Sequence, residues 1–229
     1  MNSTLSTVAA AQDVQALKGA WRQITPTSCP NHFNFHMHSV FSDGKLTPEE
    51  IVDQAIAIGL SGFAITDHHT VKGFLAAQDY LNHQQDQTEQ PLPKLWTGIE
   101  INGVLSDVPV HILGYGFDPK HGALEHYRQR EIQKGERAAA ETIVGAIHKA
   151  GGLAVLAHPA RYRRPAPELI PSAAELGFDG VEVYYAYDNP DPWRSSLKHT
   201  DNMEAIAEKY DLMRTCGTDT HGRNLQQRL

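Results

Sequence analysis

Short apolar segments alternate with amphipathic helical segments along most of the chain. The pattern predicts strands wherever a short apolar run rich in β-branched or aromatic residues occurs, at residues 33–38, 61–67, 94–102, 108–117, 151–159, 178–185 and 212–219. Apolar residues that recur every three or four positions predict helices at residues 7–24, 46–59, 74–82, 124–150, 166–177 and 197–210. The polar residues 83–93 predict a surface loop. This alternation favours parallel βαβ units, in an open sheet or a closed barrel.

Two local signals refine the pattern. Thr47, Pro48 and Glu50 form a capping-box sequence at the start of a helix, and Gly59 predicts its end. The strands at 94–102 and 108–117 are close enough in sequence to form a hairpin around residues 103–107.

Length, charge and cysteine content restrict the class of protein. The chain has 229 residues, which suits one barrel or doubly wound domain, and its formal net charge of −7 argues against a face for extended duplex nucleic acid. Cys29 and Cys216 are too few for a disulfide framework and predict free thiols. No leader or membrane-spanning run is evident, so we expect a cytoplasmic protein without a membrane partner. The composition leaves the oligomeric state open.

Histidines and carboxylates gather at the predicted strand ends. Each of the seven predicted strands carries at least one such residue within it or just after it, the set being His36, His38, Asp67, His68, Glu100, His111, His158, Glu182, Asp219 and His221. A single strand histidine is more often a hydrogen-bonded core residue than a ligand, and an HxH pair alone also fits a solvated face. Because the carboxyl ends of parallel strands share one edge, the full set predicts a single convergent site.

The chemistry of these residues indicates metal binding. Convergent buried charges are costly unless a positive centre compensates them. Imidazole with carboxylate and without thiolate suits Mn, Fe, Zn or Ni. The set is too large for one four-coordinate zinc, so two or three divalent ions are expected.

The motifs together resemble the PHP (polymerase and histidinol phosphatase) domain family over residues 32–224. They are "FHMHSVFSDG", "ITDHHT", "TGIEIN", "VHILGYG", "LAHPARY" and "GTDTHG". The resemblance implies a distorted (βα)7 barrel with a trinuclear metal centre, formed by residues 31–229 behind an N-terminal helical extension at residues 1–30. It also implies hydrolysis of phosphomonoesters, most often with Mn²⁺ and sometimes with Fe or Zn.

The resemblance assigns metal ligands residue by residue. The first ion would be held by His36, His38, Glu100 and Asp219. Glu100 would bridge to a second ion, held also by His111 and His158. The third ion would be held by Asp43, His68 and His221. Among family branches, the motifs are most similar to the one acting on nucleotide phosphates and RNA ends, so we expect a small phosphorylated substrate, a nucleotide or an oligonucleotide end among the options. That branch usually carries a long helical insertion, whereas 46 residues separate His111 from His158 here.

Three further residues are candidates for catalysis. Arg161 has the planar fork that matches phosphate and is expected to stabilise charge as a hydroxide held between the ions attacks phosphorus. Asp67 is expected to accept a hydrogen bond from a ligand imidazole. His69 could orient His68 or protonate the leaving group, but we expect a supporting or structural role for it.

Two other functions compete with a phosphoesterase. An amidohydrolase-like C–N hydrolase shares the HxH start, but it predicts a lysine at a strand end, and none occurs here. A regulatory module that binds metal without turnover is the third hypothesis. Degenerate domains of that kind lose ligands, whereas this sequence retains the full set.

Overall fold

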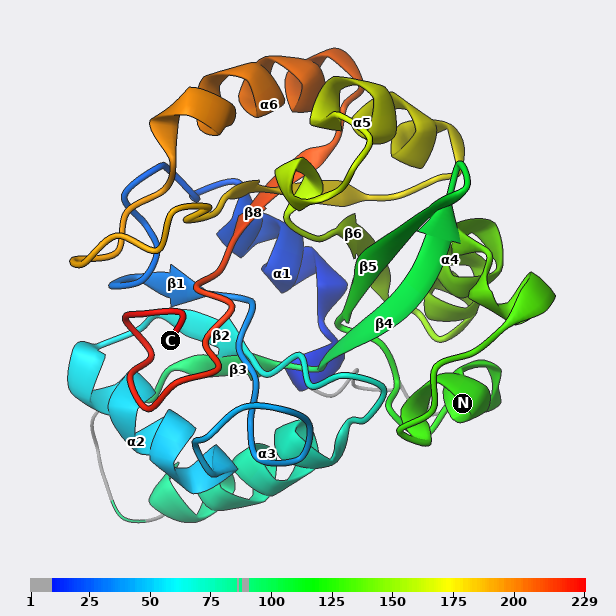
Figure 1. The fold of residues 1–229 in the computed structure, drawn as a ribbon. Helices are drawn as coiled ribbons and strands as arrows, with labels where there is room; N and C mark the ends of the chain where they lie inside the picture. Colours follow the sequence, from blue (N-terminus) through cyan, green and yellow to red (C-terminus); the bar gives the residue numbers. More distant parts are fainter. Residues whose placement is uncertain (1–9, 86, 88–90) are drawn as a thin grey trace, which may run out of the picture.

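The computed structural model describes residues 10–85, 87 and 91–229 and shows an α/β fold (Figure 1). Its strands are β1 (Phe33–Asn34), β2 (Gly62–Ala64), β3 (Lys94–Trp96), β4 (Gly98–Leu105), β5 (Val108–Tyr115), β6 (Leu153–Leu156), β7 (Gly180–Tyr184) and β8 (Met213–Cys216). Its α-helices are α1 (Val14–Trp21), α2 (Pro48–Ile58), α3 (Lys72–Gln85), α4 (Ala140–Lys149), α5 (Ala166–Glu175) and α6 (Leu197–Lys209). Short 3₁₀ turns are η1 (Ala10–Gln12), η2 (Gly122–Arg128), η3 (Gly135–Ala138) and η4 (Pro159–Arg161).

The described strands form two sheets with the orders β1-β2-β3 and β4-β5-β6-β7-β8. Pairing is parallel in the first sheet and between β6, β7 and β8, but β5 is antiparallel to both of its neighbours. The predicted hairpin is confirmed by the antiparallel pairing of β4 and β5, whereas the parallel βαβ pattern does not hold at β5. The reason is the short turn at Ser106 and Asp107, which have φ of 48° and 62° and connect β4 to β5 without a crossover.

The closed (βα)7 barrel implied by the family resemblance is not present in the described part of the chain. Instead, isolated bridges pair Met37 with Thr220, and His68 with Glu100 of β4. Phe35 N–H also donates to the carbonyl of Cys216 at 3.0 Å, which connects the segment after β1 to β8. The segments that carry the predicted ligands thus lie where the two sheets approach each other.

The predicted helix at residues 124–150 is wrong in its first half. The structure has η2, an irregular stretch, η3 and then α4 in this region. Arg130 and Gly135 have φ of 61° and 59°, a conformation that interrupts a right-handed helix. The capping box before α2 is confirmed, because Thr47 accepts from Glu50 N–H and the Glu50 carboxylate accepts from Thr47 N–H.

Helix α1 packs into the main hydrophobic core. Trp21 is buried, and its ring packs edge-on against Tyr115 and Phe35, with centroids 5.4 and 6.2 Å apart. The Tyr115 hydroxyl donates to the Phe35 carbonyl at 2.8 Å. Residues 7–9 of the predicted N-terminal helix lie outside the described residues, and a domain boundary near residue 30 stays a prediction.

The prediction of free thiols is confirmed. Cys29 and Cys216 are free and buried, and burial, with Cys216 close by, raises the pKa of the Cys29 thiol. None of the described helices combines the length and apolar character that a membrane crossing requires.

Candidate metal centre

The segment after β1 places His36 and His38 in the interior, both fully buried. Alternation of the extended chain puts the two imidazoles on one side, with ring centroids 5.3 Å apart. The chain then turns tightly, because Gly44 N–H donates to the Ser39 carbonyl at 3.0 Å. A Cβ at Gly44 would lie 2.1 Å from the His38 carbonyl oxygen, so only glycine fits. This turn brings Asp43 back toward His38, with Oδ1 3.5 Å from Nδ1.

Glu100, on β4, lies at the centre of the site and is buried. Its Oε2 lies 3.1 Å from His36 Nε2 and 3.0 Å from His38 Nε2, while its Oε1 lies 2.8 Å from His111 Nδ1. Three groups of side chains bring their ligand atoms within 4.8 Å of one another: His36, His38, Glu100 and Asp219; His68, Glu100 and His111; and His38, Asp43, His68 and His221. His158 Nε2 approaches the same carboxylate at 3.5 Å. The structure therefore brings all nine predicted ligands together.

The donor set fits divalent ions. Among the described residues, buried His38 Nε2 and Glu100 Oε1 make no hydrogen bond although oppositely charged groups lie beside them. Burial alone would raise the pKa of Glu100, but His36, His111 and His68 hold it well below its usual range. Metal ligation requires ionised carboxylates and imidazole nitrogens that are free of other hydrogen bonds, and this site provides both.

Backbone geometry at the site is unusual. His158 and Asp219 have φ of 25° and 54°, values that residues other than glycine seldom adopt. Such conformations cost about 1–3 kcal/mol each and persist where the surroundings hold them in place. A Cβ at Gly217 would lie 2.2 Å from the Cβ of His36, so the chain before Asp219 passes directly against the first histidine.

Glu182, on β7, is a site residue whose role the sequence did not reveal. Its Oε1 lies 3.0 Å from His36 Nδ1, and its Oε2 accepts a hydrogen bond from the backbone N–H of His158 at 2.9 Å. A carboxylate behind a ligand imidazole fixes its tautomer and orientation. The sequence feature that could have indicated this role is the position of Glu182 within a predicted buried strand, in line with the other strand carboxylates and histidines.

Asp67 has a different role from the predicted one. In the described residues its carboxylate contacts no imidazole. It accepts hydrogen bonds from Ser39 N–H at 2.7 Å, Ser39 Oγ at 2.6 Å and Ser42 Oγ at 2.7 Å. Asp67 therefore holds the turn that carries Asp43, and acts on the site by fixing that loop.

His69 lies beside His68 and reaches His111 through Asn102. The rings of His69 and His68 are stacked, with centroids 6.4 Å apart. His69 Nε2 lies 2.7 Å from Asn102 Oδ1, and Asn102 Nδ2 lies 3.2 Å from His111 Nε2. Burial lowers the pKa of His69 and so favours the neutral form of its ring. His69 thus supports His111 through Asn102, and its burial disfavours a role in protonating a leaving group.

Arg161 lies at the edge of the centre. Its Nη1 donates to Asp219 Oδ2 at 3.0 Å and to the Tyr185 hydroxyl at 2.8 Å, and 40% of its side chain remains exposed. The guanidinium is therefore anchored to one candidate ligand while part of it faces solvent.

Comparison with known proteins identifies the family. The model of the PHP domain matches residues 34–213. The chain belongs to the PHP domain family. This match covers the strands and loops that carry the clustered residues up to β8.

Known relatives of this PHP domain share about a quarter of its residues. A 5′-3′ exoribonuclease from Haemophilus influenzae is 23% identical over 259 aligned positions, covering 82% of this chain and 89% of the relative. A 3′,5′-nucleoside bisphosphate phosphatase from Chromobacterium violaceum is 24% identical over 262 positions, covering 83% of this chain and 87% of the relative. Both alignments are longer than this chain, so the relatives contain residues that it lacks. A structure described as a metal-dependent phosphoesterase from Bifidobacterium adolescentis has the same fold, with a TM-score of 0.67, 23% identity, and coverage of 85% of this chain and 89% of that one.

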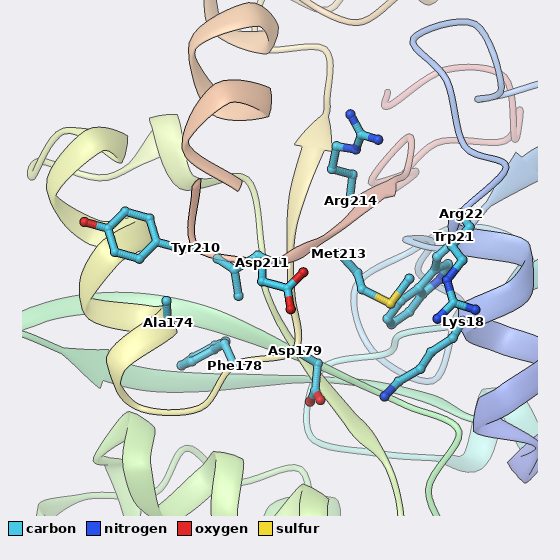
Figure 2. Close-up of a pocket in the computed structure, with 11 residues that line it drawn as sticks. Lys18, Trp21, Arg22, Ala174, Phe178, Asp179, Tyr210, Asp211, Met213 and Arg214 are labelled. Atoms are coloured by element: carbon cyan, nitrogen blue, oxygen red, sulfur yellow. The ribbon is translucent and has the colours of Figure 1, made fainter. Parts of the chain in front are cut away.

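A second concave region lies away from the metal centre of the PHP domain. Figure 2 shows this cavity of about 530 Å³, lined by residues that include Lys18, Trp21, Arg22, Asp179 and Arg214. Asp179 precedes β7 and Arg214 lies near the start of β8, whereas the ligand Asp219 follows the end of β8. The cavity is therefore at the opposite ends of these strands.

Metal uptake by the PHP domain is expected to release protons at pH 8. Burial favours the neutral form of His38, but Asp219 and Glu100 outweigh it and raise its pKa to about 9. Because an imidazole nitrogen must be unprotonated to bind metal, Mn²⁺ affinity should rise with pH up to about 9 and then level off. Titration calorimetry in two buffers of different ionisation enthalpy counts the protons, and equal heats in both would contradict the prediction.

The same pKa shift makes the metal-free protein less stable as pH rises, whereas its Mn²⁺ affinity increases. A histidine whose folded pKa is raised contributes its full stabilisation below the unfolded pKa of about 6.5 and loses it as pH rises through the folded value. The contribution of His38 should therefore decline between about pH 6.5 and pH 9. Chemical unfolding in EDTA across this range measures it.

Proposed function

We propose that this PHP domain hydrolyses phosphomonoesters at a trinuclear centre, with Mn²⁺ as the preferred ion. The observation that carries the proposal is the Glu100 carboxylate, whose two oxygens face different groups of histidines. The other residues of the three groups surround this carboxylate, as a centre with a bridging ligand requires. Fe and Zn are alternatives that suit the same ligands.

The residues would divide the work as follows. His36, His38 and Asp219 would hold the first ion together with Glu100. His111 and His158, which lie by the other Glu100 oxygen, would hold the second, and Asp43, His68 and His221 would hold the third. Bound divalent ions would lower the pKa of a water molecule and offset the charge on the phosphoryl oxygens.

The protein itself fixes this arrangement and adds one cation. Glu182 orients His36, Asn102 orients His111, and Asp67 holds the turn carrying Asp43. Arg161 provides guanidinium donors at the solvent-facing edge, where substrate would enter. A donor that is already held in place stabilises the charge that develops in the transition state, because the donor does not have to be reoriented during the reaction.

The substrate class is proposed from the named relatives. An exoribonuclease acts on RNA, and a 3′,5′-nucleoside bisphosphate phosphatase removes a phosphate from a nucleotide. Both names place a phosphate ester next to a nucleoside. We therefore propose a nucleotide or an oligonucleotide end as substrate, with sugar phosphates as the nearest alternative.

The test is phosphate release from nucleoside monophosphates, a 3′,5′-bisphosphate, a short 5′-phosphorylated RNA and sugar phosphates, each with Mn²⁺. We expect release from the nucleotide class by the native chain and none by His36→Ala. His148→Ala is the matched control, since His148 lies on α4, is 40% exposed and pairs with Asp179 by the cavity of Figure 2. Absence of release from every ester by Mn²⁺-loaded native protein would refute the proposal.

A further inference from the structure

The segment that follows β8, residues 217–229, turns back against the metal centre. Its path is fixed by Leu225, which is fully buried and whose carbonyl accepts a hydrogen bond from Asn34 Nδ2 at 3.2 Å. Thr220 Oγ1 donates to the carbonyl of Gln227 at 2.8 Å, and His221 N–H donates to the carbonyl of Arg228 at 2.6 Å. Figure 1 shows this segment in red, beside β1 and β2. The backbone of Arg228 is therefore held directly against a candidate metal ligand.

The side chain of Arg228 reaches the same carboxylate as Arg161. Arg228 Nε lies 2.9 Å from Asp219 Oδ2, Arg161 Nη1 lies 3.0 Å from it, and the Tyr185 hydroxyl donates to it at 2.7 Å. The other oxygen of this carboxylate faces the buried histidines, with Oδ1 3.2 Å from His38 Nε2. Asp219 thus separates a metal-facing side from a side occupied by two guanidinium groups.

The two guanidinium groups carry more positive charge and more N–H donors than the Asp219 carboxylate can neutralise or accept. Two guanidinium groups carry two positive charges, whereas Asp219 has one negative charge, and that charge also faces the histidines. Each guanidinium has five N–H donors, of which one oxygen engages only a small part. The side chains keep 40% exposure at Arg161 and 19% at Arg228, so part of each remains accessible to a ligand from solvent.

We propose that Arg228 and Arg161 form the recognition site for the terminal phosphate of the substrate, so that the enzyme prefers a dianionic phosphomonoester to a monoanionic phosphodiester. The inference rests on the proposed function and deepens it. A terminal phosphate offers three non-bridging oxygens and a second negative charge that a diester lacks, and paired planar forks match that geometry. Arg228 is a substrate-binding residue in this proposal.

The experiment uses the whole chain loaded with Mn²⁺ and takes inorganic phosphate as the probe. Calorimetry should show phosphate binding weakened at least about tenfold in Arg228→Gln and less in Arg228→Lys, because a charge-assisted hydrogen bond is lost in the first and partly kept in the second. Binding of Mn²⁺ without phosphate should change less than about threefold, since Arg228 contacts the oxygen of Asp219 that faces away from the histidines. Arg214→Gln, in the cavity of Figure 2, is the matched control and should change neither.

A second measurement compares p-nitrophenyl phosphate with bis-p-nitrophenyl phosphate. The ratio of kcat/KM for the monoester to that for the diester should fall at least about tenfold in Arg228→Gln. An unchanged ratio with unchanged phosphate binding would overturn the proposal. Equal losses of Mn²⁺ and phosphate binding would also overturn it, since they would mean that Arg228 only supports Asp219. If the native protein hydrolyses neither ester, the nucleotide panel still decides the proposed function, and the phosphate-binding result decides the role of Arg228.

Discussion

Replacement of Glu100 by glutamine is expected to reduce phosphate release more than about a hundredfold. Glutamine keeps the size of the side chain but removes the charge and replaces one acceptor oxygen with a donor. Both Glu100 oxygens face imidazoles, so one of the groups that contain Glu100 loses a ligand atom and both lose the negative charge of the carboxylate. Changes to residues that merely support a ligand already cost about 10–100-fold in metal affinity or activity, and a shared ligand should cost more.

The measurement pairs phosphate release with Mn²⁺ stoichiometry. Glu100→Gln should bind fewer Mn²⁺ ions than the native chain, and excess Mn²⁺ should not restore its activity. Glu141→Gln provides the control, because Glu141 is exposed on α4. Native activity and native stoichiometry in Glu100→Gln would show that this carboxylate is not the shared ligand.

Replacement of Trp21 by alanine is expected to lower the free energy of unfolding by about 3–5 kcal/mol, the usual cost of removing a large buried aromatic side chain. Trp21 is 2% exposed and packs edge-on against Phe35 and Tyr115. Phe35 immediately precedes His36, so the cavity left by the indole would also loosen the segment carrying the first histidine. Urea unfolding in EDTA measures the stability without a contribution from bound metal.

Two variants separate packing from other effects. Trp21→Phe should lose much less stability than Trp21→Ala, because phenylalanine keeps most of the aromatic contact and removes an indole N–H that is buried without a hydrogen-bond partner among the described residues. Arg22→Ala, at the exposed neighbouring position, should change stability by no more than about 0.5 kcal/mol. If Trp21→Ala lowered the free energy of unfolding by less than about 1 kcal/mol, packing of α1 against the core would not stabilise the fold as expected.

The sequence by itself determined the local features and the clustering of the candidate ligands. The capping box of α2 depends on residues three apart, and the same hydrogen bonds appear in the structure. The clustering of the predicted ligands could be inferred because strand ends share an edge of a sheet, a rule that needs no knowledge of side-chain contacts. The free state of the two cysteines followed in the same way from their number.

Only the tertiary structure decided how the sheets join and which groups support the ligands. The hairpin of β4 and β5 was predicted, but the antiparallel pairing of β5 with β6 depends on how distant elements pack. Asp67 contacts serines and not an imidazole, and His69 acts through Asn102. Arg228 meets Asp219 because residues 217–229 fold back.

These differences have one physical reason. Periodicity and capping arise from interactions within a few residues, which the sequence specifies directly. Hydrogen bonds between buried side chains, such as Glu182 to His36, join residues 146 positions apart and depend on the angle and separation at which whole elements pack. A polar residue in a strand can satisfy its hydrogen bonds with several neighbours, and close packing of the core selects among them.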